Sequence, residues 1–177
     1  VTVKGGPNSP VASSDANGKD FVFISSTIIS TNIGSMFRDV SVPVIVSESY
    51  LLDDMHMTGS IAGIDYGVSN NVSQLVMLNG AHPLGQPLSG TFSVTTANPS
   101  LRWGKPSGSA DKIAKIAGSF NKSALFVYDT GDMMVGLSAP AVRIGFFFDD
   151  FTATHPTGNA WILLDNTVNY VLGSSTC

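Results

Sequence analysis

The sequence predicts one α/β domain of three layers, with a central sheet that is parallel in the first half of the chain and antiparallel in the second. Three observations indicate this class. Short apolar runs in the first half end in polar turns, which is typical of buried parallel strands. After residue 90 the strands follow one another too closely for helices between them, so antiparallel pairing is expected. A helical pattern closes the chain, and its apolar stripe predicts packing on the sheet.

The composition indicates a secreted protein with a full core. A chain of 177 residues buries about 70% of its unfolded surface and needs no stabilising cross-links. Charged residues make up only 12%, against about 25% in average domains, so the surface depends on Ser, Thr, Asn and Gly. We therefore expect an extracellular location, either secreted or at the cell surface.

Two partner classes are disfavoured. The net charge is −4 and the nine Lys and Arg are scattered, whereas nucleic-acid binding needs clustered cations. No apolar run approaches the roughly 18 residues that cross a bilayer, so no membrane span is expected.

The single cysteine and the first residues are ambiguous. Cys177 is the last residue, which excludes an intrachain disulfide and a cysteine metal cluster. It is interpreted as a tail residue, with an intermolecular disulfide as the alternative. Residues 1–3 predict a strand that begins abruptly, as expected after removal of a signal peptide or in a piece of a longer protein.

Polar side chains follow two predicted strands in the first half. Residues 21–24 end in a Ser-Ser-Thr turn, and residues 42–46 end at Ser47 and Glu48. The segment 30–37 between them predicts a short helix or turn, and an acidic helix-prone segment follows the second strand. Ligands of open α/β sheets usually bind at the carboxyl ends of the strands, so the stretch 39–59 is the expected centre of the domain.

The second half contains shorter elements. Strands are predicted over residues 74–78, 90–96, 110–117, 124–128 and 142–148. The closing helix is predicted over residues 158–172, with Thr157 as its cap and Gly173 after its end. Its apolar stripe is Trp161, Leu164, Val168 and Val171.

Ser47, Glu48 and His82 are the candidate catalytic residues. A Ser or Glu at the tip of a buried strand occupies the place of a nucleophile elbow, yet the G-x-S-x-G pattern is absent. The bases that a triad would need are His56, His82 and His155, and its acid could be Asp53, Asp54, Asp149 or Asp150. All of them are scattered along the chain. In the alternative interpretation, Glu48 and the next serine cap and charge the start of a helix.

The acidic pairs do not predict a metal site. Asp54 and His56 are two residues apart, so on a helix they point in different directions. Asp149 and Asp150 follow an aromatic strand, but calcium needs six or more oxygen ligands. No metal and no cofactor is therefore expected, and Asp53 and His56 are kept as candidate ligand-binding residues.

Two further candidates for ligand binding lie in predicted loops. Trp103, between Arg102 and Lys105, could stack on a sugar or form a cation–π contact, with a structural role as the alternative. His82 precedes a proline and is either a ligand-binding or a loop-ordering side chain. Glu48 is the fifth candidate ligand-binding residue, beside Asp53, His56, His82 and Trp103.

Several stretches together resemble a known superfamily. They are DVSVPVIVSESYLLDDMHMTG, AHPLGQPLSG, SALFVYDTGDMM, APAVRIGFFFDD and NAWILLDNTVNYVLG. The chain resembles the class I glutamine amidotransferase-like superfamily, on the ThuA-like (trehalose-utilisation) branch, from Val1 to Gly173. His82-Pro83-Leu84 is similar to an element that follows the middle strands of that branch. The resemblance implies a flavodoxin-like sheet in a domain of secreted bacterial multidomain proteins, often attached to carbohydrate-active or adhesive modules.

Two departures from the superfamily matter. Its cysteine nucleophile has no counterpart, since Ser47 and Glu48 are the nearest matches, so glutaminase chemistry is not implied. Such domains also usually open with an additional βα unit, which in a 2-1-3-4-5 strand order would supply the central strand. Either the remaining strands close up, or another polypeptide donates the strand and creates a dimer or filament.

The sequence thus favours a single amidotransferase-like domain over residues 1–177, without an N-terminal βα unit. The expected function is a non-catalytic accessory, binding or assembly module of a larger secreted protein. Expected partners are a carbohydrate and a second copy or strand-donating chain. The alternative is a hydrolase of a carbohydrate or ester, with a Ser/Glu/His site at the carboxyl end of the sheet.

Overall fold

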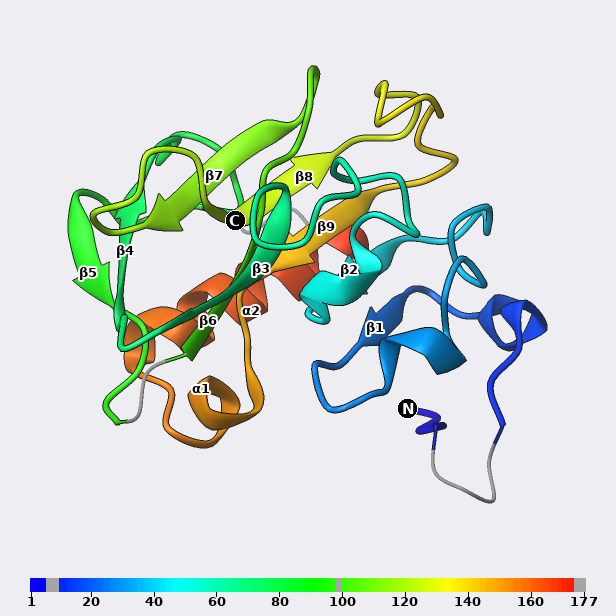
Figure 1. Cartoon of the computed structure of the whole chain (residues 1–177), viewed down its shortest axis with the longest axis horizontal. Coiled ribbons are helices and arrows are strands. Elements are labelled where there is room, and N and C mark those ends of the chain that lie inside the picture. The colour runs from blue at the N-terminus through cyan, green and yellow to red at the C-terminus, as the bar shows by residue number, and fades with distance from the viewer. Residues whose placement is uncertain (6–9, 98–99, 174–177) are drawn as a thin grey trace.

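A computed structural model describes residues 1–5, 10–97 and 100–173. Nine strands form one mixed sheet with a long helix against one face (Figure 1). The strands are β1 (Val22–Ile24), β2 (Val44–Val46), β3 (Tyr66–Asn70), β4 (Gln74–Met77), β5 (Thr91–Ser93), β6 (Ser100–Gly104), β7 (Asp111–Ile116), β8 (Ser123–Tyr128) and β9 (Arg143–Phe146). The helices are α1 (Asp150–Thr154) and α2 (Gly158–Val171), with single 3₁₀ turns η1 (Ser13–Ala16), η2 (Ser30–Asn32) and η3 (Ser49–Leu51).

The parallel part of the sheet consists of β1, β2 and β9. Ile45 in β2 lies between Phe23 of β1 and Ile144 of β9. All three residues of β2 are buried, as the unbroken apolar run predicts for a parallel strand covered on both faces. The α/β class, with a parallel first half, is therefore confirmed. For the last strand, β9, the sequence predicts antiparallel pairing. β9 does pair antiparallel with β8, but it also pairs parallel with β2.

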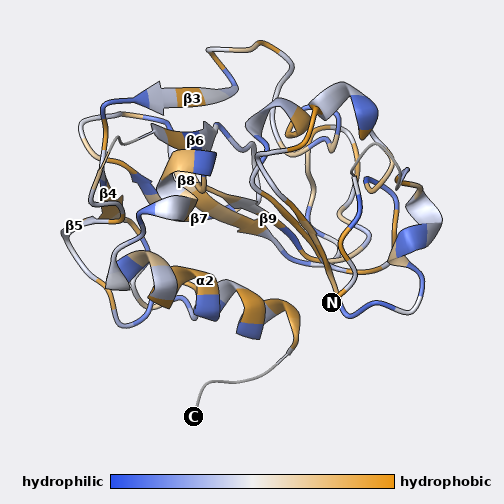
Figure 2. Cartoon of the chain, turned by 90° about the horizontal axis from the view of Figure 1, so that it is seen from below, coloured by the Kyte–Doolittle hydropathy of each residue, from blue (hydrophilic) through white to orange (hydrophobic). Residues whose placement is uncertain are grey.

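The antiparallel part continues from β9 through β8, β7, β4 and β5. β3 and β6 form an antiparallel ribbon that joins the main sheet at one pair, Gly104 and Ser123. Figure 2 places this ribbon on the opposite side of β8 and β9 from α2. The third layer is thus the ribbon together with η3, and not a set of helices.

Two buried clusters fill the space between these layers. One lies between the sheet and α2 and includes Ile45, Ile144 and Leu163. The other lies on the opposite face and includes Leu51, Met55 and Phe126. η3 packs on this second cluster, so the residues after β2 are fixed against the sheet.

Some local predictions are wrong. Residues 1–3 have no strand partner among the described residues, and β2 is followed by a 3₁₀ turn in place of a helix. The short helix or turn expected over residues 30–37 is present, as a 3₁₀ turn at Ser30–Asn32. β3, β6 and α1 were not predicted. Helix propensity predicts the structure of such short segments poorly, because a segment of fewer than about 12 residues rarely forms a helix without tertiary packing.

The closing helix is confirmed, but of its predicted stripe only Val171 is buried. The Thr157 hydroxyl accepts a hydrogen bond from the Ala160 amide at 3.4 Å, and Gly173 follows with a positive φ of 66°. The buried side chains are Ala160, Leu163, Thr167 and Val171, whereas Trp161 is 50% exposed. A small residue and a threonine lie on the buried stripe, so apolar character alone does not identify it.

Candidate functional site

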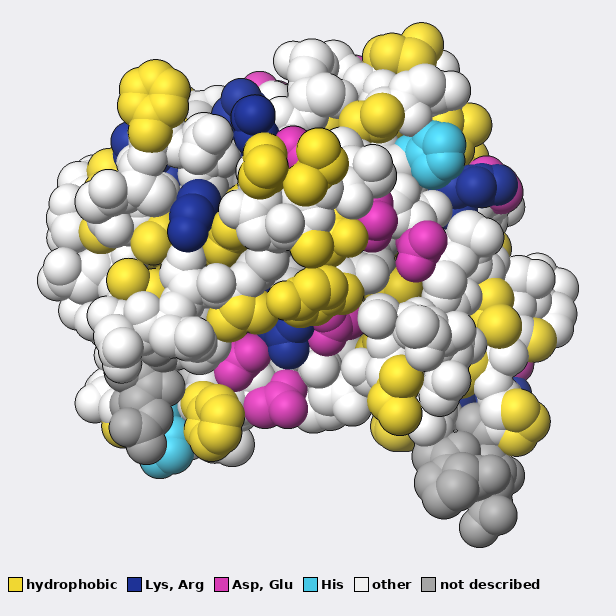
Figure 3. All heavy atoms as spheres, in the orientation of Figure 1, with side chains coloured by type: hydrophobic (Ala, Val, Ile, Leu, Met, Phe, Trp, Pro, Cys, Tyr) yellow, Lys and Arg dark blue, Asp and Glu magenta, His cyan; other side chains and the backbone are white. Residues whose placement is uncertain are grey.

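Polar side chains gather at the carboxyl ends of the three parallel strands. Ser26 follows β1, Glu48 follows β2, and Asp149 and Asp150 follow β9. Arg102 reaches them from β6 in the ribbon above the sheet, where its backbone amide bonds the Phe147 carbonyl at 3.0 Å. Figure 3 shows acidic side chains around a basic one in the lower middle of this face, directly below a band of hydrophobic side chains.

Arg102 joins the two strand ends. Its Nη1 donates to Glu48 Oε1 and its Nε donates to Asp149 Oδ2, both at 2.9 Å. The side chain of Arg102 is 13% exposed, that of Glu48 5% and that of Asp149 10%. Because these charges are largely removed from water, their mutual hydrogen bonds offset part of the cost of burying them.

The two carboxylates also organise the backbone. Glu48 Oε1 accepts the amide of Tyr50 at 2.9 Å and caps η3, while Asp149 Oδ1 accepts the amide of Phe151 and caps α1. Burial raises the pKa of Glu48, against the lowering effect of its backbone hydrogen bond and of Arg102. The capping role that the sequence suggested for Glu48 is therefore present, and the same carboxylate belongs to the charged site.

A neighbouring carboxylate extends the cluster. Asp150 Oδ1 accepts a hydrogen bond from the Ser26 hydroxyl at 2.5 Å, so the end of β1 is linked to the start of α1. The site then holds three carboxylates and one guanidinium. Its net charge is negative, which disfavours anionic ligands.

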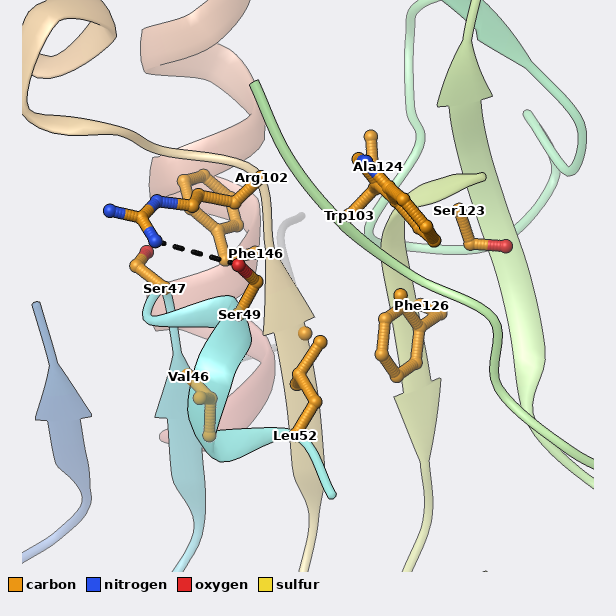
Figure 4. A pocket seen from close by; sticks show the side chains of 12 residues that line it. Val46, Ser47, Ser49, Leu52, Arg102, Trp103, Ser123, Ala124, Phe126 and Phe146 are labelled. Atoms are coloured by element: carbon orange, nitrogen blue, oxygen red, sulfur yellow. Dashed lines mark hydrogen bonds between the residues drawn. The ribbon is translucent and has the colours of Figure 1, made fainter. Parts of the chain in front are cut away.

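Ser47 contributes a hydroxyl without a partner. Its side chain is buried, with 1% exposed, and Oγ makes no hydrogen bond in the described part of the chain. Ser47, Ser49 and Arg102 lie together at one end of a small pocket between η3, β6 and β9 (Figure 4). An unpaired buried hydroxyl costs about 1–3 kcal/mol, so a polar ligand group at this position would be stabilised.

Two glycines allow this close packing. A Cβ on Gly104 would lie 2.8 Å from Leu52 Cδ1 and 3.1 Å from the Phe126 ring, and a Cβ on Gly145 would overlap that ring. Gly104 therefore lets Leu52 and the Phe126 ring pack against β6, and Gly145 lets the same ring lie over β9.

A tyrosine pair borders the charged cluster. The ring of Tyr50 is 46% exposed and meets Tyr66 edge-to-face, with centroids 5.7 Å apart. The Tyr66 hydroxyl donates to Asp53 Oδ2 at 3.0 Å. Asp53, a predicted ligand-binding residue, therefore positions this aromatic pair. Burial and this hydrogen bond raise the pKa of Tyr66 to about 12.

His82 lies at the other end of the sheet. Its ring packs on Tyr170 at 5.3 Å between centroids, and the Tyr170 hydroxyl bonds Asp129, which directly follows β8. Because Tyr128 is paired with Arg143 at the start of β9, this cluster is at the amino end of the parallel strands. The structure does not bring His82 together with Ser47 and Glu48.

The other two histidines are also engaged elsewhere. His56 Nδ1 bonds the carbonyl of Val135 at 2.6 Å, in the connection between β8 and β9. His155 bonds Thr154 and lies at the end of α1. No histidine hydrogen-bonds Ser47 among the described residues, so no nucleophile–base pair is assembled there.

Trp103 is not an exposed aromatic side chain. It is 4% exposed, and its ring packs against Gly67 and under Lys122, whose Nζ is 4.6 Å from the ring centroid. The predicted cation–π contact exists, but with Lys122 in place of Arg102 or Lys105. The structural interpretation of Trp103 is the one that the packing favours, because a buried ring offers no face to a sugar.

Sequence reasoning did not place Arg102 and Tyr50 in a site, and it considered Asp149 only as one of four possible triad acids. The alternation Leu101-Arg102-Trp103, with buried apolar residues on both sides of the arginine, is the signal of a strand that aims Arg102 at the opposite face. Asp149 was recognised as a strand end, but its approach to Glu48 follows from the pairing of β9 with β2, nearly 100 residues apart.

The described residues contain no group of three or more His, Cys, Asp or Glu that could hold a metal ion. None of their helices has the length and apolar character required to span a bilayer.

Comparison with known proteins identifies the fold and not a close relative. No family model matches, and no curated protein matches in sequence. A solved cytoplasmic protein of Salmonella typhimurium LT2 is similar with a TM-score of 0.60 and 11% identity, over 93% of this chain and 76% of that one. A protein described as a GMP synthase component from Thermoplasma acidophilum has a TM-score of 0.58 and 10% identity, over 93% and 78%. A ThuA-like protein from Bacteroides uniformis has a TM-score of 0.53 and 9% identity, over 90% and 72%.

These neighbours confirm the class I glutamine amidotransferase-like fold that the sequence resembled. The described sheet and its closing helix therefore form a flavodoxin-like architecture. At 9–11% identity the likeness shows the fold alone.

Proposed function

We propose that this amidotransferase-like domain is a non-catalytic binding module of a larger secreted or cell-surface protein, with a carbohydrate as its ligand. The observation that carries the proposal is the set of hydrogen bonds in the charged site. Arg102 is paired through Nη1 with Glu48 and through Nε with Asp149, and no described base contacts Ser47. Such a site can recognise hydroxyl groups through charge-assisted hydrogen bonds, but it lacks the base that activates a serine.

Calorimetry with product analysis tests this function. The chain is titrated with neutral oligosaccharides of glucose, galactose, mannose and xylose, and the sugars are then examined by mass spectrometry. We expect saturable binding with the sugars intact, and a loss of binding in Arg102→Met. Cleaved sugars would contradict the non-catalytic assignment, and absence of binding would contradict the ligand class.

A hydrolase of a carbohydrate or ester is favoured by one observation, the unpaired hydroxyl of Ser47 at the end of β2. A fluorophosphonate probe distinguishes the two functions, because it labels activated serines. The binding module predicts an unchanged intact mass. An adduct that disappears in Ser47→Ala would establish a serine hydrolase.

Assembly is a second function that a separate surface supports. β1 is the edge strand and pairs directly with β2, so the described strands close up. Phe23 shares the α2 face with its neighbour Ile45, yet Phe23 is 39% exposed and Ile45 is fully buried. In Figure 2, α2 lies beneath the other half of the sheet. A strand donated by a second copy would pair the free edge of β1 and cover Phe23.

Light scattering during size-exclusion chromatography tests assembly. An oligomer heavier than the 18.5 kDa chain that Phe23→Asp returns to a monomer would support it. Phe120→Asp is the matched control, because Phe120 is 95% exposed and lies between β7 and β8. A wild-type monomer would contradict assembly and leave the binding function unaffected.

A further inference from the structure

The exposed ring of Tyr50 is held rigidly beside the charged site. Tyr50 follows Ser49 directly, and its amide donates to the same Glu48 oxygen that receives Arg102. Its ring is fixed by the edge-to-face contact with Tyr66, and Tyr66 is itself fixed by Asp53. An aromatic ring that is half exposed and yet immobilised loses little conformational entropy when a ligand packs on it.

The charges beside this ring restrict the class of ligand. An anion would meet three carboxylates, Glu48, Asp149 and Asp150. The guanidinium of Arg102 forms no hydrogen bond through Nη2 within the described residues, so it can still donate to a ligand. A neutral group rich in hydroxyls avoids the repulsion and suits both kinds of side chain, since each hydroxyl can donate to a carboxylate and accept from a guanidinium.

The buried hydroxyl of Ser47 is an independent sign of a ligand. It lines the pocket next to Arg102 and Ser49 and has no partner among the described residues. A hydroxyl of the ligand that entered this pocket would satisfy it. Glu48, Arg102 and Ser47 would then bind polar atoms, while Tyr50 offers the apolar surface that they lack.

We propose that Tyr50 is the stacking platform for one pyranose ring of a neutral carbohydrate, whose hydroxyls bond Glu48, Arg102 and Ser47. This inference rests on the proposed binding function and adds to it a contact residue and a selectivity. The apolar face of the sugar packs on the tyrosine ring, as is usual when aromatic side chains anchor a ligand. Uronic-acid oligosaccharides, which carry carboxylates, are rejected by the acidic cluster.

Calorimetric titration of four proteins tests the platform: wild type, Tyr50→Ala, Tyr50→Trp and Phe120→Ala. The probes are the neutral oligosaccharides named above, a uronic-acid oligosaccharide and choline. Tyr50→Ala is expected to weaken neutral-sugar binding about tenfold or more, whereas Tyr50→Trp and the control Phe120→Ala retain it. Circular dichroism checks the fold of each variant.

The outcomes separate the platform from the binding function. If wild type binds a neutral sugar and Tyr50→Ala binds it equally well, the platform is overturned and the binding function stands. Tighter binding of the uronic-acid probe or of choline would overturn the selectivity. If wild type binds none of the sugars, both proposals fail.

Discussion

Replacing Arg102 by methionine is expected to destabilise the protein by about 3–5 kcal/mol at pH 7. The substitution removes two hydrogen bonds of 2.9 Å and leaves Glu48 and Asp149, 5% and 10% exposed, without a counter-charge. Removing one partner of a buried ion pair has this effect, because the remaining charge stays desolvated. Urea denaturation followed by circular dichroism measures the free energy of unfolding.

The pH dependence of this variant gives a second readout. Burial already raises the pKa of Glu48 in the folded protein, so the folded state binds a proton there more readily than the unfolded chain does. Stability contributed by this group therefore falls as the pH rises through its folded pKa. Without Arg102 the pKa of Glu48 rises further, and part of the lost stability should return on acidification from pH 7 to pH 5.

Arg38→Met is the matched control for Arg102→Met. Arg38 also pairs with a carboxylate, that of Asp39, but the two side chains are 32% and 61% exposed. Exposed pairs contribute about 0–1 kcal/mol. If both variants lose the same small amount, with the same pH dependence, the buried charged site described above does not exist in solution.

Four other substitutions probe the packing that supports the site. Arg143 is fully buried and donates to five backbone carbonyls. Arg143→Met should therefore lower the midpoint of urea denaturation markedly. An unchanged midpoint would show that these hydrogen bonds do not stabilise the protein. Gly145→Ala forces a Cβ into the Phe126 ring and should lower the free energy of unfolding by about 1–3 kcal/mol. Thermal denaturation would detect this loss as a lower melting temperature. An unchanged melting temperature would contradict the close packing of Phe126 on Gly145. An ultraviolet pH titration follows the ionisation of the tyrosines, and the signal of Tyr66 is the one that disappears in Tyr66→Phe. This signal should have a pKa of about 12, and Asp53→Asn should lower that pKa. A Tyr66 signal with a pKa near 10 would contradict the hydrogen bond between Tyr66 and Asp53.

The sequence was most informative where local pattern and tertiary packing agree. The run Val44–Val46 is apolar on every residue, and the structure buries it on both faces of a parallel strand. The closing helix carries its cap at Thr157 and its terminating glycine, and both are confirmed. Such features depend on residues close in sequence, so they can be predicted without knowing the rest of the fold.

The candidate site could be predicted only in part, because it depends on contacts between distant segments. Glu48 was placed correctly at the end of β2, but its partners come from β6 and from the segment after β9. Arg102 lies in β6, which was not predicted, and β6 pairs with β3, which was not predicted either. His82 was a suitable base by residue type alone. In the structure it lies near the end of β8, which is antiparallel to β9, so it is at the opposite end of the strands from Glu48.

The most direct test of the account is an amide chemical-shift map of the labelled protein titrated with a neutral oligosaccharide. The account predicts that the largest shifts fall on Ser47 to Tyr50, on Arg102 and on Asp149 and Asp150, at the carboxyl ends of the parallel strands. Shifts confined to the amino ends of the parallel strands, around His82, Asp129 and Tyr170, would contradict it, as would a spectrum that does not change.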